Sequence, residues 1–98
     1  MRFQFRDKKL EALYTEEKNA HKYPSVDDFF EVMAVIQAAL DERDLYANKG
    51  LRFEKLSGQR GKQGQRSLRL NKQWRLIVTL EADEEGSYLQ IIDIEDYH

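Results

Sequence analysis

Two arginines and the last three residues of the sequence carry the side chains best suited to phosphodiester chemistry. Arg69 and Arg75 fall at polar positions of two predicted neighbouring strands, where a guanidinium can hold a phosphate through paired hydrogen bonds. The sequence ends in Asp96, Tyr97 and His98, directly after another predicted strand. An imidazole carries protons at neutral pH, and a tyrosine can stack on a base or donate to a phosphate. Together these residues suit metal-free cleavage of a phosphodiester.

Each of these residues also has an ordinary structural explanation. The two arginines could pair with the acids of the last strand, and a histidine at the end of a sequence is commonly frayed. Trp74 is expected to be a large apolar anchor in the core rather than a site residue. Only the combination of these residue types on one surface favours a nuclease.

The charge of the chain is distributed unevenly. The 27 residues from Lys49 to Arg75 carry a net charge of +8, with Glu54 as their one acid, whereas the other 71 residues carry −10. A basic segment of this kind predicts a surface for a polyanion such as RNA. The residues expected to contact RNA or phosphate, besides the two arginines above, are Arg60, Lys62, Arg66 and Lys55.

The composition argues against several other kinds of site. The chain has no cysteine and only two histidines, which excludes disulfides, thiolate metal sites, cysteine nucleophiles and histidine-rich metal centres. We therefore expect neither a metal nor another cofactor. The longest uncharged run, Val32 to Leu40, has nine residues and is too short to span a membrane, and the apolar segment of a secretory signal is lacking. The expectation is a cytoplasmic protein without a membrane partner.

The elements that must position these residues begin with a strand and two helices. Residues 2–6 alternate as a short strand, and Asp7 offers an N-cap to a first helix that Pro24 is expected to end. Ser25 is expected to cap a second helix, whose apolar stripe extends at helical spacing to Leu40. That helix is predicted to fray around residues 42–44.

From residue 51 onward apolar residues alternate with polar ones, which is the period of strands. A glycine-rich stretch at 58–64 interrupts the alternation, and further strands follow, joined by a tight turn at 71–73 and an acidic turn at 82–87. This order predicts one α+β domain over residues 1–98, with two N-terminal helices on one face of a mainly antiparallel sheet and the other face free. Its core is expected to draw mostly on Phe3, Phe29, Phe30, Met33, Ile36, Leu40, Leu68, Trp74, Leu76 and Val78.

Several motifs resemble the HigB branch of the RelE superfamily, which consists of toxins of bacterial toxin–antitoxin modules. The motifs are Leu56-Ser-Gly58, Arg60, Ser67-Leu-Arg-Leu-Asn71, Gln73-Trp-Arg75 and Asp96-Tyr-His98. The resemblance implies a RelE-like fold and an endoribonuclease that cleaves mRNA in the ribosomal A site, with the 2′-hydroxyl attacking the adjacent phosphate. At the matching positions it implies phosphate contact for Arg69 and Arg75 and proton transfer for His98, with Asp96 and Tyr97 completing the site.

The chain departs from the family pattern at two positions. Glu54 stands where many HigB toxins have a histidine, and Ser57 stands where they have a lysine. A proton carrier and a cation are therefore missing from the expected site, and Lys55, one residue further along a strand, would point to the opposite face.

The leading interpretation is a ribosome-dependent mRNA endoribonuclease that inhibits translation. Its expected partners are mRNA, the ribosome and a cognate helix-turn-helix antitoxin similar to HigA, through which alone it would contact operator DNA. The alternative is an attenuated or non-catalytic RelE-fold protein that binds antitoxin, RNA or both without efficient cleavage. A stand-alone RNA-binding module is a third and weaker interpretation.

Overall fold

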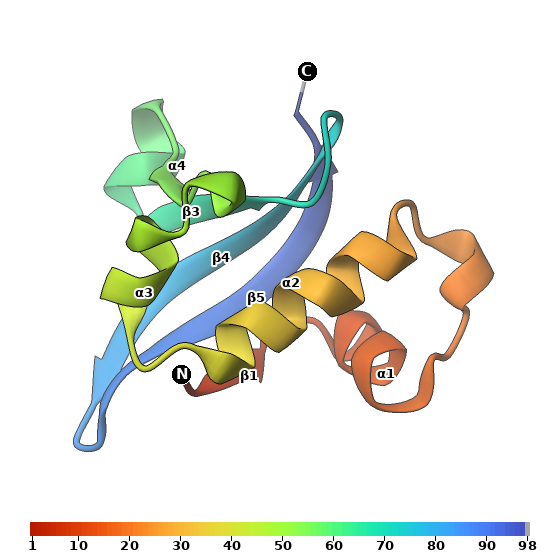
Figure 1. Cartoon of the computed structure of the whole chain (residues 1–98), viewed down its shortest axis with the longest axis horizontal. Helices are drawn as coiled ribbons and strands as arrows, with labels where there is room; N and C mark the ends of the chain where they lie inside the picture. The colour runs from red at the N-terminus through yellow and green to blue at the C-terminus, as the bar shows by residue number, and fades with distance from the viewer. Residues whose placement is uncertain (98) are drawn as a thin grey trace.

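A computed structural model describes residues 1–97 and shows a mixed sheet with helices on both of its sides (Figure 1). The strands are β1 (Phe3–Phe5), β2 (Glu54–Lys55), β3 (Gln65–Arg69), β4 (Trp74–Asp83) and β5 (Gly86–Asp96). The helices are α1 (Lys8–Glu16), α2 (Val26–Ala38), α3 (Glu42–Ala47) and α4 (Gly58–Lys62), with 3₁₀ turns at Ala20–Lys22 and Lys49–Leu51. The predicted α+β class is confirmed.

Within the described residues the sheet has the strand order β1-β5-β4-β3-β2. β1 runs parallel to β5, and every other neighbouring pair is antiparallel, so the sheet is mainly antiparallel as predicted. The apolar strand β5 lies inside the sheet, and its pairing with β4 shifts register at Ile77/Val78. A shift of this kind is a β-bulge, which bends and twists the strand that carries the extra residue.

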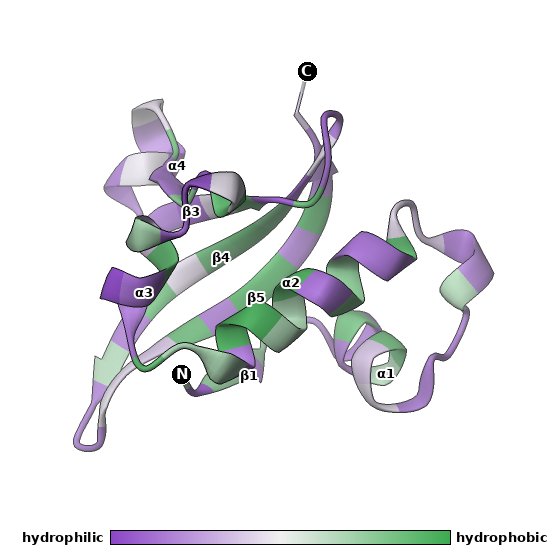
Figure 2. Ribbon diagram, viewed as in Figure 1, coloured by the Kyte–Doolittle hydropathy of each residue, from purple (hydrophilic) through white to green (hydrophobic). Residues whose placement is uncertain are grey.

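The core lies between one face of this sheet and the helices α1 and α2, and α1 contacts β1 and β5. Figure 2 shows the apolar stretches of α2, β4 and β5 in green. Six of the ten predicted core residues are buried: Phe29, Met33, Ile36, Leu68, Leu76 and Val78. Phe3, Phe30 and Trp74 are partly buried and pack against this core. Strand alternation places Leu68, Leu76 and Val78 on the covered face, which leaves the residues between them on the opposite face.

The prediction for Leu40 is wrong. α2 ends at Ala38, and Ala39 has an extended backbone, so Leu40 leaves the apolar stripe and is 87% exposed. The chain also does not fray at 42–44, because α3 begins there with the Asp41 carboxylate accepting a hydrogen bond from the Arg43 backbone N–H at 3.0 Å. Helical spacing predicted the stripe but not the residue at which the helix ends.

Replacing Leu13 and Leu40 by alanine in separate variants tests this core directly. Leu13 is fully buried, so Leu13→Ala is expected to lower the free energy of unfolding by about 3–5 kcal/mol through lost transfer energy and a cavity. Leu40→Ala removes the same atoms from an exposed side chain and is expected to change stability by less than about 0.5 kcal/mol. Denaturant unfolding measures both. Equal losses in the two variants would contradict the burial described here.

Two expectations about helix ends also need correction. Asp7 caps α1 as predicted, accepting from the Lys9 backbone N–H at 2.7 Å, but the helix ends at Glu16 with Glu17 in the left-handed region rather than at Pro24. Ser25 precedes α2 but makes no side-chain capping bond. Its backbone is in the left-handed region, and its hydroxyl donates to the Asp28 carboxylate at 2.7 Å.

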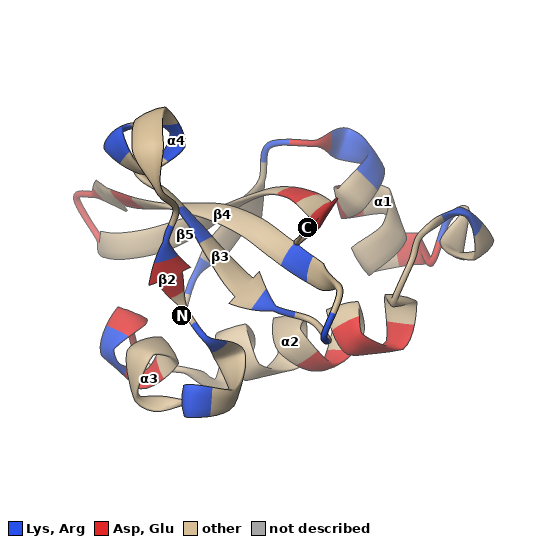
Figure 3. Ribbon diagram, turned by 90° about the horizontal axis from the view of Figure 1, so that it is seen from above, with Lys and Arg blue, Asp and Glu red and all other residues tan. Residues whose placement is uncertain are grey.

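The glycine-rich stretch that interrupts the strand alternation forms the short helix α4. Position 61 requires a glycine, because a Cβ atom at this position would lie only 1.8 Å from the carbonyl oxygen of Leu56. The close approach joins α4 to the segment that follows β2. Figure 3 shows α4 on the side of the sheet opposite α2 and α3, so the prediction that this face is free is wrong.

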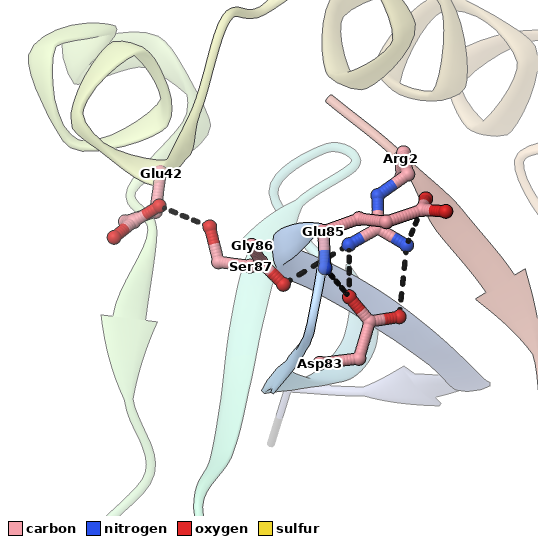
Figure 4. Close-up of polar contacts among 6 residues, drawn as sticks. All are labelled: Arg2, Glu42, Asp83, Glu85, Gly86 and Ser87. Carbon is pink, nitrogen blue, oxygen red and sulfur yellow. Dashed lines mark hydrogen bonds and ion pairs between the residues drawn. The ribbon is translucent and has the colours of Figure 1, made fainter.

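The acidic turn between β4 and β5 is tied to the start of the chain (Figure 4). Arg2 donates to both carboxylate oxygens of Asp83, at 2.6 and 3.0 Å, and to the carbonyl of Gly86 at 3.0 Å. This pairing holds the pKa of Asp83 below its ordinary value. Ser87 donates to Glu42 at 2.8 Å, which joins the same hairpin to α3. Asp83 and Glu42 therefore have structural partners outside the predicted site.

Candidate functional site

A pocket of about 420 Å³ lies on the sheet face opposite the core, beside α4. Its lining residues come from the β2–α4 connection, α4, the three strands β3 to β5, and the segment after β5. They are Leu56, Ser57, Arg60, Ser67, Arg75, Ile77, Glu95, Asp96 and Tyr97. The pocket therefore brings together Arg60, Arg75, Asp96 and Tyr97 from the predicted site residues.

Arg75 is the most buried charged side chain in this pocket. It is only 7% exposed, and its Nη1 donates to the backbone carbonyls of Asn71 at 2.8 Å and Trp74 at 3.3 Å. Its guanidinium carbon lies 3.8 Å from the centre of the Tyr97 ring, a cation–π arrangement. Within residues 1–97 the protein acceptors engage Nη1, so Nε and Nη2 keep donors for a ligand.

Arg60 and Glu95 form an ion pair within the same pocket. Nη1 and Nη2 of Arg60 each donate to one oxygen of Glu95 at 2.8 Å, and Nε donates to Gln65 at 2.8 Å. The Glu95 carboxylate raises the pKa of Arg60, which stays fully charged. One arginine thus pairs with an acid of the last strand, but it is Arg60 and neither Arg69 nor Arg75.

The end of β5 is held by the turn that joins β3 to β4, and the two segments lie side by side in Figure 1. The Tyr97 backbone N–H donates to the Gln73 carbonyl at 2.7 Å, and the Gln73 side-chain amide donates to Asp96 at 3.1 Å. These bonds fix Tyr97 beside Arg75 although the residue is 59% exposed. His98 lies outside the described residues.

Comparison with known proteins decides the family. Residues 3–98 match the HigB-like toxins, described as RelE-like toxins HigB of type II toxin–antitoxin systems. This chain belongs to the HigB-like toxin family. Toxin HigB-1 of Vibrio cholerae serotype O1 is 39% identical over 79 residues, which cover 79% of this chain and 81% of that protein. The resemblance found in the motifs is thereby confirmed.

Two solved structures share the fold of this HigB-like toxin. The YoeB/ParE toxin from Agrobacterium tumefaciens has a TM-score of 0.56 at 13% identity, and each chain is covered completely. The YoeB-YefM complex from Staphylococcus aureus has a TM-score of 0.52 at 22% identity, covering 100% of this chain and 97% of that chain. At these identities the likeness concerns the fold, which is the RelE-like one predicted.

The other basic residues singled out in the sequence lie on β2, β3 and α4, and Figure 3 marks the lysines and arginines of these elements in blue. Arg69 is the direct cross-strand partner of Arg75 and is half-buried. Arg66 donates to the Tyr46 hydroxyl at 3.1 Å and to the Gly64 carbonyl at 3.2 Å. Lys62 and Lys55 are exposed. None of these four side chains lines the pocket.

Of the two positions that depart from the HigB pattern, one lines the pocket and the other does not. Ser57 lines the pocket, whereas Glu54 is exposed on β2 and lies opposite Ser67 outside the lining. Lys55 is paired with Arg66, so it occupies the alternate strand position. The serine therefore leaves the pocket without the lysine that the family pattern places there.

Five residues of the pocket were not among the predicted site residues, namely Leu56, Ser57, Ser67, Ile77 and Glu95. The alternation of strands could have found two of them, because Ser67 and Ile77 share the phase of Arg69 and Arg75. Glu95 is the cross-strand partner of Arg75. That pairing depends on the bulge at Ile77/Val78, which could not be predicted from the sequence.

Other features of the described residues lie apart from this site. A hollow of about 540 Å³ beside α1 is lined by Lys8, Lys9, Ala12, Lys18, Asn19, Lys22 and Tyr23, and it contains none of the predicted catalytic residues. Residues 1–97 contain no group of three or more histidine or acidic side chains placed to hold a metal ion. Their helices are all too short or too polar to cross a bilayer.

Proposed function

We propose that this HigB-like toxin cleaves mRNA on the ribosome and thereby inhibits translation. The observation that carries the proposal is the buried guanidinium of Arg75, stacked on Tyr97 in a pocket that also contains Asp96. A guanidinium held in this way needs little reorganisation when charge develops on a phosphate. Family membership and the RelE-like fold support the same activity.

The proposed reaction is attack of a ribose 2′-oxygen on the adjacent phosphorus. The bond from phosphorus to the 5′-oxygen breaks, which leaves a 2′,3′-cyclic phosphate and a 5′-hydroxyl. Arg75 donates hydrogen bonds to the non-bridging oxygens, where negative charge builds up in the transition state. A proton leaves the 2′-hydroxyl and another reaches the 5′-oxygen, and His98 is the proposed carrier.

The basic surface around the pocket would hold the mRNA backbone. Affinity for ribosome-bound or free RNA is expected to fall about tenfold or more between 50 and 200 mM salt, because phosphate contacts release counterions. Arg69→Ala should weaken binding, whereas Asp83→Asn should not, since Asp83 pairs with Arg2 away from the pocket. Fluorescence anisotropy over a salt series measures this. Affinity that is flat across the series would exclude an electrostatic RNA surface.

A second candidate function is a weakly cleaving or non-catalytic member that binds antitoxin, RNA or both. The Arg60–Glu95 ion pair favours this second function, because the Glu95 carboxylate binds the guanidinium that would otherwise bind a phosphate. The absence of the family lysine at Ser57 favours it as well.

Glu95→Gln tests how far this ion pair weakens RNA binding. The neutral amide should release Arg60 and raise RNA affinity several-fold, since one carboxylate is removed from a site that must hold phosphates. Glu84→Gln removes the same charge from an exposed position in the β4–β5 turn and serves as the matched control. If both variants bind equally well, Arg60 does not contact RNA.

The proposed partners are the ribosome with its mRNA and a cognate antitoxin of the helix-turn-helix, HigA-like type. The family of type II toxins supports an antitoxin, and the similar fold from Staphylococcus aureus was solved as a YoeB-YefM complex. Operator DNA would be contacted only through the antitoxin, and the site of action would be the cytoplasm.

Induced expression tests this proposal in cells. The protein alone should arrest growth, and co-expression with a helix-turn-helix protein encoded beside it should restore growth by occupying the toxin. Growth that is unaffected by the protein alone would contradict the toxic activity. Arrest that no neighbouring reading frame relieves would contradict the proposed antitoxin.

A further inference from the structure

Asn71 lies in the turn between β3 and β4, and its side-chain amide uses all of its hydrogen-bonding groups. Oδ1 accepts from the backbone N–H groups of Gln73 at 2.8 Å and Trp74 at 2.9 Å. Nδ2 donates to the hydroxyl of Ser25 and to the carboxylate of Asp28, the latter at 3.3 Å. An amide has two acceptor sites and two donor hydrogens, so Asn71 is saturated.

The oxygen and the nitrogen of this amide bind different parts of the chain. Oδ1 closes the turn locally, which is a common use of asparagine. Nδ2 reaches 46 residues back in the sequence to Ser25, at the start of α2. Ser25 in turn donates to Asp28 at 2.7 Å, and the next residue, Phe29, is fully buried in the core. The turn is therefore fastened to a helix that the core holds in place.

Both partners of the cation–π contact in the pocket depend on this turn. The backbone carbonyl of Asn71 accepts from Nη1 of Arg75 at 2.8 Å. Two residues later, the carbonyl of Gln73 accepts from the Tyr97 backbone N–H at 2.7 Å, and the Gln73 side chain holds Asp96. A shift of the turn would move the guanidinium and the ring together, because each is bonded to it.

We propose that Asn71 is a positioning residue, which clamps the β3–β4 turn to the start of α2 and so sets the guanidinium of Arg75 against the ring of Tyr97. The inference rests on the proposed function for its effect on cleavage. Aspartate cannot replace asparagine in this role, because it keeps the acceptor for the turn but has no hydrogen to donate and would face Asp28.

Asn71→Asp separates the two halves of the amide. Cleavage of ribosome-bound mRNA should fall about tenfold to a hundredfold, as expected when a catalytic group is misplaced by about an ångström. The loss should appear in the rate constant more than in RNA affinity. Asn48→Asp is the matched control, because Asn48 closes another turn by accepting from Gly50 at 3.2 Å and does not line the pocket. It adds the same charge and should leave cleavage unchanged.

A reversed pair provides the sharpest test. In the double variant Asn71→Asp with Asp28→Asn, the amide at position 28 can donate to the carboxylate at position 71, so the clamp is rebuilt in the opposite direction with the original net charge. Cleavage should recover to within a few-fold of the wild type. Ser25→Ala, which removes one acceptor of Nδ2, is a milder variant expected to give an intermediate loss.

A second measurement does not require cleavage at all. The Tyr97 ring should shift the NMR resonances of the Arg75 side chain, with Tyr97→Leu as the unshifted reference. This shift should collapse in Asn71→Asp and return in the reversed pair. If the wild type does not cleave mRNA but the shifts behave in this way, the proposed function fails and the positioning role stands. An unchanged shift in Asn71→Asp, or a reversed pair that restores neither readout, would overturn the positioning role.

Discussion

Deleting His98 is expected to remove most of the mRNA cleavage by this HigB-like toxin, with a loss of about 10²–10⁴-fold in rate. The residue follows Tyr97, whose backbone is fixed to Gln73 at 2.7 Å beside the pocket. An imidazole changes protonation near neutral pH, which suits it to both proton transfers of the proposed reaction. The measurement is the single-turnover cleavage rate on ribosomes carrying a defined mRNA.

The fold should survive this deletion, because the described core does not extend beyond Ile94. Thermal unfolding and antitoxin binding should therefore match the wild type. The control is His21→Ala, since His21 lies in the exposed 3₁₀ turn Ala20–Lys22 and should not affect cleavage. A deletion variant that cleaves mRNA at the wild-type rate would end the catalytic assignment of His98.

The second large effect is expected from Arg75→Lys, with a fall in cleavage of about 10²–10³-fold. Lysine keeps the charge but loses the planar fork, which stacks on Tyr97 and carries several donors at fixed angles. The rate of the chemical step should fall more than RNA affinity, because the charge that attracts phosphate is retained. Single-turnover rates and binding isotherms separate the two quantities.

Arg69→Lys is the matched control for Arg75→Lys. Arg69 is its direct cross-strand neighbour but does not line the pocket, so the same exchange should change cleavage only a few-fold. If the two exchanges reduce cleavage equally, the reaction depends on general basic charge around β3 and β4. In that case the assignment of Arg75 as the transition-state donor is wrong.

Local periodicity predicted most of the fold but not where elements end. The change from helical to strand spacing near residue 50 predicted the sheet, since burial on one face imposes that alternation. Leu40 continued the helical stripe in the sequence, yet an extended backbone at Ala39 placed it in solvent. The sequence did not predict α4, because glycines are poor helix formers. Gly61 is required in α4 by the close approach of the Leu56 carbonyl and not by helix propensity.

Long-range bonds account for what the sequence did not predict about the site. Ser25 has the residue type of an N-cap, but its hydroxyl donates to Asp28 and accepts from Asn71, which lies 46 residues along the chain. Likewise, Arg60 was predicted to meet phosphate, whereas its partner in the free protein is Glu95, 35 residues away. Such pairings depend on strand register, which local patterns leave open.

We propose that this toxin cuts mRNA on the ribosome through a 2′-hydroxyl attack assisted by Arg75. Mapping mRNA ends in cells that express the wild type or Arg75→Lys is the most direct test of this cleavage. New 5′-hydroxyl ends are expected at ribosome-occupied codons with the wild type, and a strong loss of these ends with the variant. Growth arrest by the wild type without any new mRNA ends, or ends that are equally abundant with Arg75→Lys, would contradict it.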